Sequence, residues 1–146
     1  MRIKSEVTNV KNLTLGIAHA AYHTAQMDKM LDFYCNKLEF KHAFSIAGDN
    51  GEPWIEFVKL ADGSFLEFFY AIPERMEKND DKWFTHTCIK VTDVDAVAEF
   101  LKSKGIELII EPRLGKEGNP QCWCADPDGN PIEFMCIMPG SPQAQA

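Results

Sequence analysis

The chain is internally duplicated, and a histidine and a glutamate recur at matching places in its two halves. His86 follows His19 by 67 positions, and Glu133 follows Glu67 by 66 positions. The neighbours of each glutamate also repeat, since Asp-Gly-Ser-Phe-Leu-Glu-Phe in the first half is echoed by Asp-Gly-Asn-Pro-Ile-Glu-Phe in the second. Packing alone can keep apolar residues in register in a duplicated fold. Polar residues that keep register on apolar strands indicate a shared site.

Hydrophobic periodicity predicts the same order of elements, β-α-β-β-β, in each half. In the first half we expect a helix that Thr24 caps and that runs to Leu38, and strands at 13–23, 40–46, 54–60 and 65–71. In the second half we expect a helix that Thr92 or Asp93 caps and that ends at Lys104, and strands at 85–91, 106–110, 122–125 and 132–137. A glycine-rich loop is expected at 113–121 and a loose tail at 139–146.

The repeat divides the chain into two modules, at residues 13–71 and 84–138, joined by a charged linker at 72–83. A module of roughly 65 residues buries little apolar surface by itself. We therefore expect the two modules to pack together as one domain.

Charge and composition restrict the partners that the chain can have. The formal net charge is −7, and the sequence contains no basic stripe, so nucleic acid is not an expected partner. No run of about 18 apolar residues is present to span a bilayer, and the N-terminal residues lack the apolar core of a secretory signal. Five cysteines, an odd number, indicate reduced thiols and a cytoplasmic protein. A small-molecule substrate is the expected partner.

The four recurring polar residues form a plausible metal-binding set: His19, Glu67, His86 and Glu133. Each glutamate has apolar neighbours on its strand, where burial of an unpaired carboxylate is costly. Two carboxylates balance the charge of one divalent ion that two neutral imidazoles also bind, and this ligand set suits Ni, Co, Zn, Fe or Mn without selecting among them. A single strand histidine is more often a core residue and a single glutamate more often faces solvent, but their matched recurrence favours the metal site.

Three segments resemble the vicinal oxygen chelate superfamily: Ala-His-Ala-Ala at 18–21, Leu-Asp-Phe-Tyr at 31–34 and Asp-Pro-Asp-Gly-Asn-Pro-Ile-Glu-Phe at 126–134. That superfamily includes glyoxalase I, methylmalonyl-CoA epimerase, extradiol dioxygenases, and fosfomycin and bleomycin resistance proteins. The resemblance covers about residues 13–138. It implies an α+β fold in which two tandem βαβββ modules form a curved mixed-sheet cup around a metal site.

The order His19, Glu67, His86, Glu133 is similar to the ligand order of glyoxalase I. This similarity implies a metal-dependent lyase or isomerase that converts the hemithioacetal of a 2-oxoaldehyde and a thiol through an enediolate. It also implies a homodimer. Glu133 is then the expected catalytic base that carries the proton between carbon atoms, and Glu67 assists it or serves as a ligand throughout.

The sequence departs from glyoxalase I at the positions that grip glutathione. His23 and Ala71 stand where that enzyme has an arginine and an asparagine, so we expect poor use of glutathione. His23, Arg113 and Lys116 are candidate substrate contacts, although a strand-end histidine and a solvated loop are ordinary alternatives.

Two other functions stay open at this point. One is an isomerase or epimerase of the same superfamily that acts on a thiol-free substrate. The other is a metal-binding or drug-binding resistance protein without turnover, although that class usually lacks the full ligand set. Cys122 and Cys124 share one face of a strand, where they are either two small buried apolar residues or ligands for a soft metal, and the first reading is the more common.

Overall fold

The computed structural model describes residue 15 and the ranges 17–71 and 85–146. The predicted linker at 72–83 and the first residues of the predicted N-terminal strand lie outside this part of the chain. The described residues form two four-stranded mixed sheets, in the orders β1-β4-β3-β2 and β5-β8-β7-β6. β1 pairs with β4, and β5 with β8, in parallel, while the other pairings are antiparallel. The predicted α+β fold of two βαβββ modules is therefore confirmed.

The first sheet consists of β1 (His19–Thr24), β2 (Lys41–Ala47), β3 (Pro53–Ala61) and β4 (Ser64–Tyr70). The second consists of β5 (Thr87–Lys90), β6 (Ile110–Leu114), β7 (Pro120–Ala125) and β8 (Pro131–Met135). The helices are α2 (Met27–Leu31), which continues as the π-helix η1 (Asp32–Lys37), α3 (Val94–Ser103) and α4 (Pro142–Gln145). None of the helices in the described ranges is long and apolar enough to cross a membrane.

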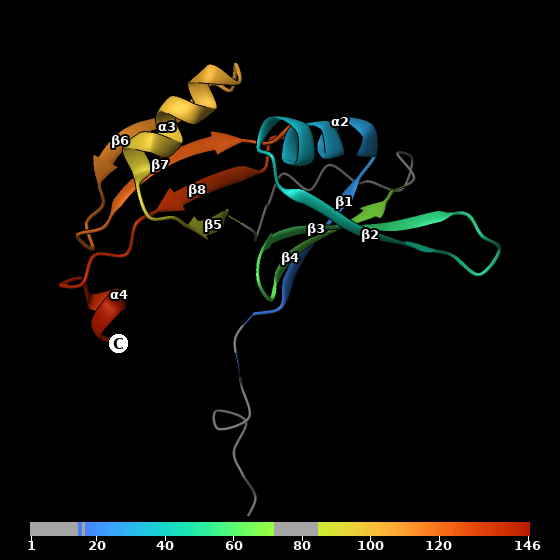
Figure 1. Ribbon diagram of the computed structural model, residues 1–146, viewed down its shortest axis with the longest axis horizontal. Helices are drawn as coiled ribbons and strands as arrows, with labels where there is room; N and C mark the ends of the chain where they lie inside the picture. Colours follow the sequence, from blue (N-terminus) through green and yellow to red (C-terminus); the bar gives the residue numbers. More distant parts are fainter. Residues whose placement is uncertain (1–14, 16, 72–84) are drawn as a thin grey trace, which may run out of the picture.

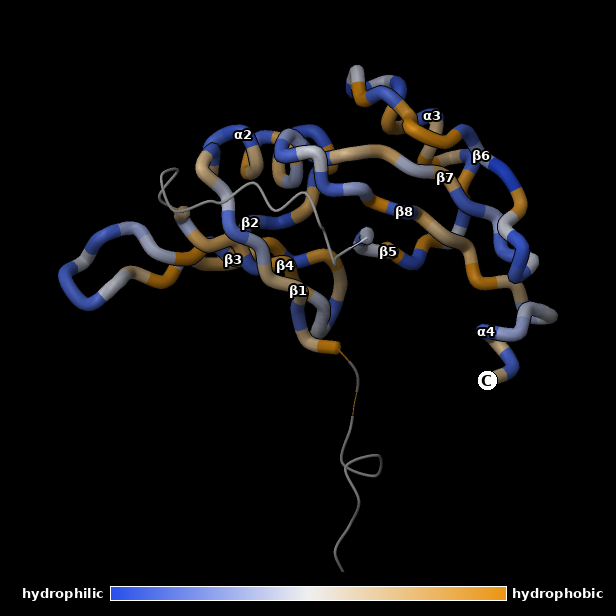
Figure 2. Tube along the Cα trace, turned by 180° about the vertical axis from the view of Figure 1, so that it is seen from behind, coloured by the Kyte–Doolittle hydropathy of each residue, from blue (hydrophilic) through white to orange (hydrophobic). Residues whose placement is uncertain are grey.

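The two sheets lie side by side, and α2 and α3 cover the same side of both (Figure 1). β1 and β5 lie at the facing edges, where the Tyr22 hydroxyl hydrogen-bonds the Thr87 hydroxyl. Figure 2, from behind, shows the same arrangement, with α2 and α3 above their sheets. The opposite side of each sheet is therefore left open by these two helices; we call it the open face.

Strand alternation assigns side chains to these two sides. Leu66 and Phe68 in β4 are fully buried in the core beneath the helices, together with Ile132 and Phe134 in β8. Because successive strand residues point to opposite faces, the glutamate between each apolar pair lies on the open face. The apolar residues thus determine which way both carboxylates point.

Cys122 and Cys124 in β7 are fully buried in the same core. Burial raises the pKa of the Cys122 thiol to about 11 and that of the Cys124 thiol to about 12, so both stay protonated near neutral pH. These two residues pack as small apolar side chains, as the more common reading of the sequence expected.

A buried hydrogen bond joins the two modules. The Tyr34 hydroxyl in η1 donates to Oδ2 of Asp126 at 2.8 Å, and Asp126 also accepts from the backbone N–H groups of Asp128 and Asn130. The side chain of Gln26 donates to Oδ1 of Asp128. Burial and the nearby Asp126 charge raise the Tyr34 pKa far above its usual range. The Asp-Pro-Asp-Gly turn therefore fixes its own shape and anchors the first module to the second.

Four predicted elements differ from the structure. The loop expected at 113–121 is shorter, because β6 extends to Leu114 and β7 begins at Pro120. The helix expected over 24–38 spans 27–37 and is a π-helix in its second part. The strand expected at 106–110 is wrong, since β6 runs over 110–114 and includes Pro112. Proline is tolerated there because β6 is the edge strand of its sheet. The tail expected at 139–146 contains α4, whose first turn Ser141 caps by accepting from the Ala144 N–H.

Candidate metal centre

The first histidine–glutamate pair lies on the open face of the first sheet. His19 begins β1, Glu67 lies in the adjacent strand β4, and the register pairs His19 with Phe65, two residues before the glutamate. This diagonal relation brings Nε2 of His19 within 2.8 Å of Oε2 of Glu67. Glu67 is 7% exposed, so the carboxylate is buried while the imidazole reaches toward solvent.

The second pair repeats this arrangement on the second sheet. His86 directly precedes β5, and its Nε2 lies 3.0 Å from Oε2 of Glu133, which is 4% exposed in β8. Nδ1 of His86 hydrogen-bonds the Thr85 hydroxyl at 2.8 Å, and the Trp123 ring lies 4.6 Å from the imidazole, measured between centroids. Hydrogen bonding at the far ring nitrogen and packing against an indole hold the imidazole in a fixed orientation.

The spacing within each pair suits two ligands of one ion. Donor atoms that lie about 2.1 Å from a metal and at right angles to each other are about 3.0 Å apart. The measured separations of 2.8 and 3.0 Å agree with this value. The chemistry also fits, because imidazole nitrogen and carboxylate oxygen are the donors that first-row divalent metals take.

The structure brings the four candidate ligands together as two pairs. Within the described ranges, no group of three or more His, Cys, Asp or Glu side chains is arranged to hold a metal ion. A groove of about 430 Å³ at the junction of the modules is lined by His19 and Phe65 on one side and by His86 and Cys88 on the other. The single site with four ligands stays a prediction.

Aromatic side chains surround the first pair. The register places Phe57 opposite Glu67, so its ring lies on the open face, 6.0 Å from the imidazole of His19. Phe44 stacks on Phe57 at 4.4 Å. His23 shares this face, and its ring centroid lies 5.4 Å from that of Phe69. Its role as a substrate contact stays a prediction. The first open face is thus an apolar, aromatic wall around one carboxylate and its histidine.

Polar side chains surround the second pair, and sequence reasoning missed them. Cys88 lies directly opposite Glu133 in the β5–β8 register. Burial, the Glu133 charge and hydrogen bond, and the Glu117 charge raise the pKa of the Cys88 thiol to about 12. Gln121, buried in β7, accepts from the Trp123 indole N–H at 2.6 Å. The period-two pattern of β7, with Gln121 and Trp123 on the face opposite to the two cysteines, is the signal that could have identified this network.

The two basic candidates lie farther along the same module. Arg113 is in β6, opposite Gln121 in the register, and its side chain is exposed. Lys116 is exposed in the turn between β6 and β7. Their role as substrate contacts stays a prediction.

A third histidine–glutamate pair was not expected from the sequence. Nε2 of His42 lies 2.6 Å from Oε2 of Glu56, which also accepts from the Ser45 hydroxyl, while Oε1 accepts from Tyr70 at 3.0 Å. Burial alone would raise the Glu56 pKa, but these hydrogen bonds together with the His42 charge lower it. The register places Glu56 opposite Phe68, on the helix side of the sheet, so this cluster stabilises the first module away from the two open-face pairs.

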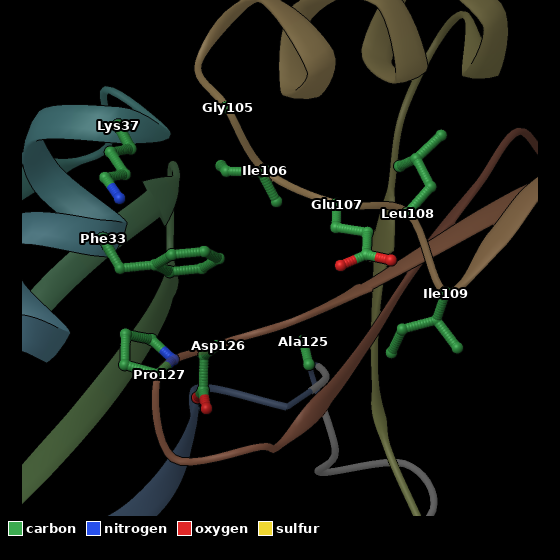
Figure 3. Close-up of a pocket in the computed structure, with 10 residues that line it drawn as sticks. All are labelled: Phe33, Lys37, Gly105, Ile106, Glu107, Leu108, Ile109, Ala125, Asp126 and Pro127. Carbon is green, nitrogen blue, oxygen red and sulfur yellow. The ribbon is translucent and has the colours of Figure 1, made fainter.

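A larger groove, of about 590 Å³, also lies on the helix side, between η1 and the segment after α3 (Figure 3). Its lining is mainly apolar, with the Phe33 ring and the Glu107 carboxylate projecting into it. The one buried carboxylate in its lining belongs to Asp126, which Tyr34 and the Asp-Pro-Asp-Gly turn engage. Size alone therefore does not identify the site, and the paired donors on the open faces are the stronger indication.

Comparison with known proteins agrees with the fold. The chain is 25% identical over 154 residues to a 2-epi-5-epi-valiolone epimerase from Actinomyces sp., an alignment that covers 90% of this chain and 84% of the relative. A glyoxalase family protein from Enterococcus faecalis superposes with a TM-score of 0.68 at 25% identity, covering 84% of this chain and 98% of that one.

A lactoylglutathione lyase from Agrobacterium tumefaciens shares the fold, with a TM-score of 0.64 at 19% identity over 84% of this chain and 93% of that one. The family model of the Glyoxalase/Bleomycin resistance protein/Dioxygenase superfamily matches residues 16–134. The chain therefore belongs to the Glyoxalase/Bleomycin resistance protein/Dioxygenase superfamily, the vicinal oxygen chelate group that its sequence resembles.

Proposed function

We propose that the protein is a metal-dependent isomerase or epimerase that moves a proton at a carbon atom next to a carbonyl group, through an enediolate. The observation that carries this proposal is the matched geometry of two histidine–glutamate pairs, one on the open face of each module. Each pair contains one buried carboxylate and one imidazole, the donors of a divalent metal site.

One divalent ion, Ni, Co, Zn, Fe or Mn, would be held by His19, Glu67, His86 and Glu133. When bound, the ion supplies Lewis-acid stabilisation of the negative charge that develops on the substrate oxygens. Two neutral imidazoles and two carboxylates balance its charge, which accounts for two carboxylates that are buried on apolar sheets.

The four ligands meet in this proposal across a homodimer. The two pairs of one chain lie on separate sheets. Helices α2 and α3 cover the same side of both sheets (Figure 1), so both pairs lie on the opposite side. A second copy related by two-fold symmetry can place its second open face against the first open face of its partner, and the reverse contact follows from the symmetry. Exposed apolar side chains on the first open face, Phe44 and Ile46, favour such burial.

Glu133 is the residue that we propose to carry the proton. Its carboxylate is 4% exposed, and it lies opposite both Trp123 and Cys88 in the strand register, which keeps bulk water away from it. Such seclusion lets a carboxylate exchange a proton with a substrate carbon atom without loss to solvent. Glu67 holds the first half of the site and assists or serves as a ligand throughout.

Two substrate classes are compatible with this chemistry. The first is the hemithioacetal of a 2-oxoaldehyde and a thiol, as the ligand order His, Glu, His, Glu implies. The second is a thiol-free carbonyl compound, and two observations favour it. His23 and Ala71 replace the glutathione-gripping residues, and the Actinomyces relative is an epimerase rather than a lactoylglutathione lyase.

Proton exchange in deuterated water tests the function without knowledge of the physiological product. Metal-loaded protein should catalyse deuterium incorporation next to the carbonyl of its substrate, followed by NMR, and removal of the metal should abolish it. The panel contains methylglyoxal with glutathione or other thiols, and thiol-free hydroxyketones. We expect exchange in the thiol-free class. A kcat/KM of about 10⁶ M⁻¹s⁻¹ or more for the glutathione adduct would restore glyoxalase I activity. Metal-independent exchange, or none on the whole panel, would contradict the proposal.

A further inference from the structure

A tight turn between β6 and β7 brings the carboxylate of Glu117 into contact with a buried amide, Gln121, in the strand that also carries Trp123. The Gly115 N–H donates to the carbonyl of Asn119 at 2.9 Å, and the Gly118 N–H donates to the carbonyl of Gly115 at 3.0 Å. Gly118 adopts a φ of 83°, which glycine accepts without strain. In this turn Oε1 of Glu117 accepts a hydrogen bond from Nε2 of Gln121 at 3.3 Å.

The space at Gly115 shows that this contact is built into the turn. A Cβ atom at position 115 would lie 2.3 Å from Oε1 of Glu117 and 2.4 Å from Nε2 of Gln121. A glycine therefore leaves the room in which the carboxylate and the amide meet. Because both obstructing atoms are ends of flexible side chains, a larger residue would displace them while the backbone keeps its course.

The contacts continue from Glu117 to the metal centre. The side-chain oxygen Oε1 of Gln121 accepts a hydrogen bond from the indole N–H of Trp123. Both the oxygen and the nitrogen of this buried side-chain amide are therefore hydrogen-bonded. The Trp123 ring packs on the His86 imidazole, and Trp123 lies opposite Glu133 in the register. An amide fixed at both ends keeps the Glu117 carboxylate in contact with Gln121, and the charge of Glu117 acts on Cys88, which lies opposite Glu133 in the register.

We propose that Glu117 is a specificity-determining residue of the metal site, which accepts hydrogen bonds from hydroxyl groups of a neutral, polyhydroxylated carbonyl substrate. The inference rests on the proposed function, which it extends to the substrate class. A carboxylate only accepts hydrogen bonds, so it pairs with hydroxyl groups and repels a carboxylate of the ligand.

The aromatic wall of the first open face supplies the complementary surface. Polyhydroxylated ring compounds present hydroxyl groups at the rim and C–H groups on their faces, and C–H groups pack well on Phe57 and Phe65. The carboxylate of Glu117 would accept hydrogen bonds from the hydroxyl groups at the rim of the ring. Arg113 and Lys116, which are exposed on β6 and in the same turn, make an anionic ligand the competing possibility, so the test must compare neutral and anionic probes.

Two six-carbon hydroxyketones serve as probes: D-fructose, which is neutral, and 5-keto-D-gluconate, which carries a carboxylate and also differs in configuration at one carbon atom. Dissociation constants are measured by calorimetry on the full, metal-loaded chain for wild type, Glu117→Gln and Gly115→Ala. Glu107→Gln, the same change at an exposed glutamate in the helix-side groove, is the matched control. Wild type should prefer D-fructose. Since hydrogen bonds to charged groups are the stronger ones, Glu117→Gln should reduce this preference about tenfold or more. Gly115→Ala should act in the same direction, and Glu107→Gln should leave the preference unchanged.

The outcomes separate this inference from the proposed function. A preference of wild type for 5-keto-D-gluconate, equal preferences in wild type and Glu117→Gln, or no binding of either probe would overturn the role of Glu117. If proton exchange on another substrate is intact in these cases, the isomerase function survives. If D-fructose binds with the expected dependence on Glu117 but no substrate undergoes exchange, the binding subsite stands and the isomerase function fails.

Discussion

Glu67 and Glu133 occupy the same local setting in different sheets. Each lies between two apolar residues that pack beneath a helix. Each carboxylate meets a histidine on the open face, His19 at the start of the parallel strand β1 and His86 directly before the parallel strand β5. Glu67 is 7% exposed and Glu133 is 4% exposed. Burial of a charged carboxylate costs folding free energy unless another charge or hydrogen-bond donor compensates it. In the proposed site, a divalent ion shared by the two pairs would provide that compensation, and Glu133 would act as the proton acceptor.

Replacement of Glu133 by glutamine tests its role as the base. The amide cannot take up the proton, so turnover on the substrate that shows proton exchange should fall by roughly 10²- to 10⁴-fold. Metal content must be measured alongside, because the same carboxylate is a proposed ligand. Near-normal turnover in a metal-loaded Glu133→Gln protein would exclude Glu133 as the base. Glu107→Gln, on the helix side, is the control that should retain activity.

The Glu56 cluster should make stability depend on pH. The hydrogen bonds from Ser45, His42 and Tyr70 lower the Glu56 pKa, so its contribution is present above the ordinary glutamate pKa and is lost as the pH falls through the lowered value. Glu56→Gln should lower the free energy of unfolding at pH 7 by about 1–3 kcal/mol, since hydrogen-bonded groups are left without a charged partner. Denaturant titrations from pH 7 to pH 3 should show this difference shrinking in acid. A difference that grows in acid would contradict the assignment.

The elements show which features follow from local sequence and which require tertiary contacts. Alternation and turn residues predict the order of strands and the face of each glutamate, because these depend only on the period of the backbone. The position of β6 does not follow in this way. Its proline is acceptable only at a sheet edge, and the edge is set by the pairing of β6 with β7. The contact of η1 with the other module does not follow from local sequence either, since its Tyr34 donates to the buried Asp126, 92 positions later in the chain.

The same division applies to the candidate site. The recurrence of two residue types identified the histidine–glutamate pairs, because a duplication keeps them in register. Glu117 and Gln121 occur once, in the second module, so no repeat marks them. Their importance depends on how a turn folds back over a strand, which only the structure shows.

The Tyr34–Asp126 bond provides a test at the level of elements. Tyr34→Phe removes a buried hydroxyl that donates to a carboxylate at 2.8 Å, and should lower the free energy of unfolding by about 1–3 kcal/mol. Tyr70→Phe removes a similar bond to Glu56 at a partly exposed site, so its effect should be smaller. Denaturant unfolding of both variants measures the comparison. An equal or larger loss in Tyr70→Phe would show that Tyr34 does not anchor the modules.

At the scale of the whole molecule, the placement of both helices on one side leaves the two histidine–glutamate pairs on open faces. A solitary chain would expose aromatic side chains beside a buried carboxylate, which is an unusual surface for a protein that has no partner. In the proposed homodimer, assembly of two copies through these faces would bury the exposed apolar residues and would complete the ligand set. We therefore predict that metal binding weakens when the dimer dissociates.

Self-association should depend on the first open face. Phe44, 47% exposed in β2, stacks on Phe57 and lies on that face. Phe44→Lys should shift the protein from dimer toward monomer in sedimentation analysis and weaken metal binding at the same time. Ile109→Lys, an exposed position in the helix-side groove, is the matched control and should stay dimeric. Wild-type protein that sediments as a monomer with bound metal would contradict the assembly.

The most direct test of the central claim is the metal content of the purified protein and of two histidine variants. The account predicts one divalent ion per chain in the wild type, because a dimer builds two equivalent sites. His86→Ala should lose most of this metal. His42→Ala removes the histidine of the pair on the helix side, 2.6 Å from Glu56, and should keep it. Unchanged stoichiometry in His86→Ala, or equal loss in both variants, would contradict a metal centre built from His19, Glu67, His86 and Glu133.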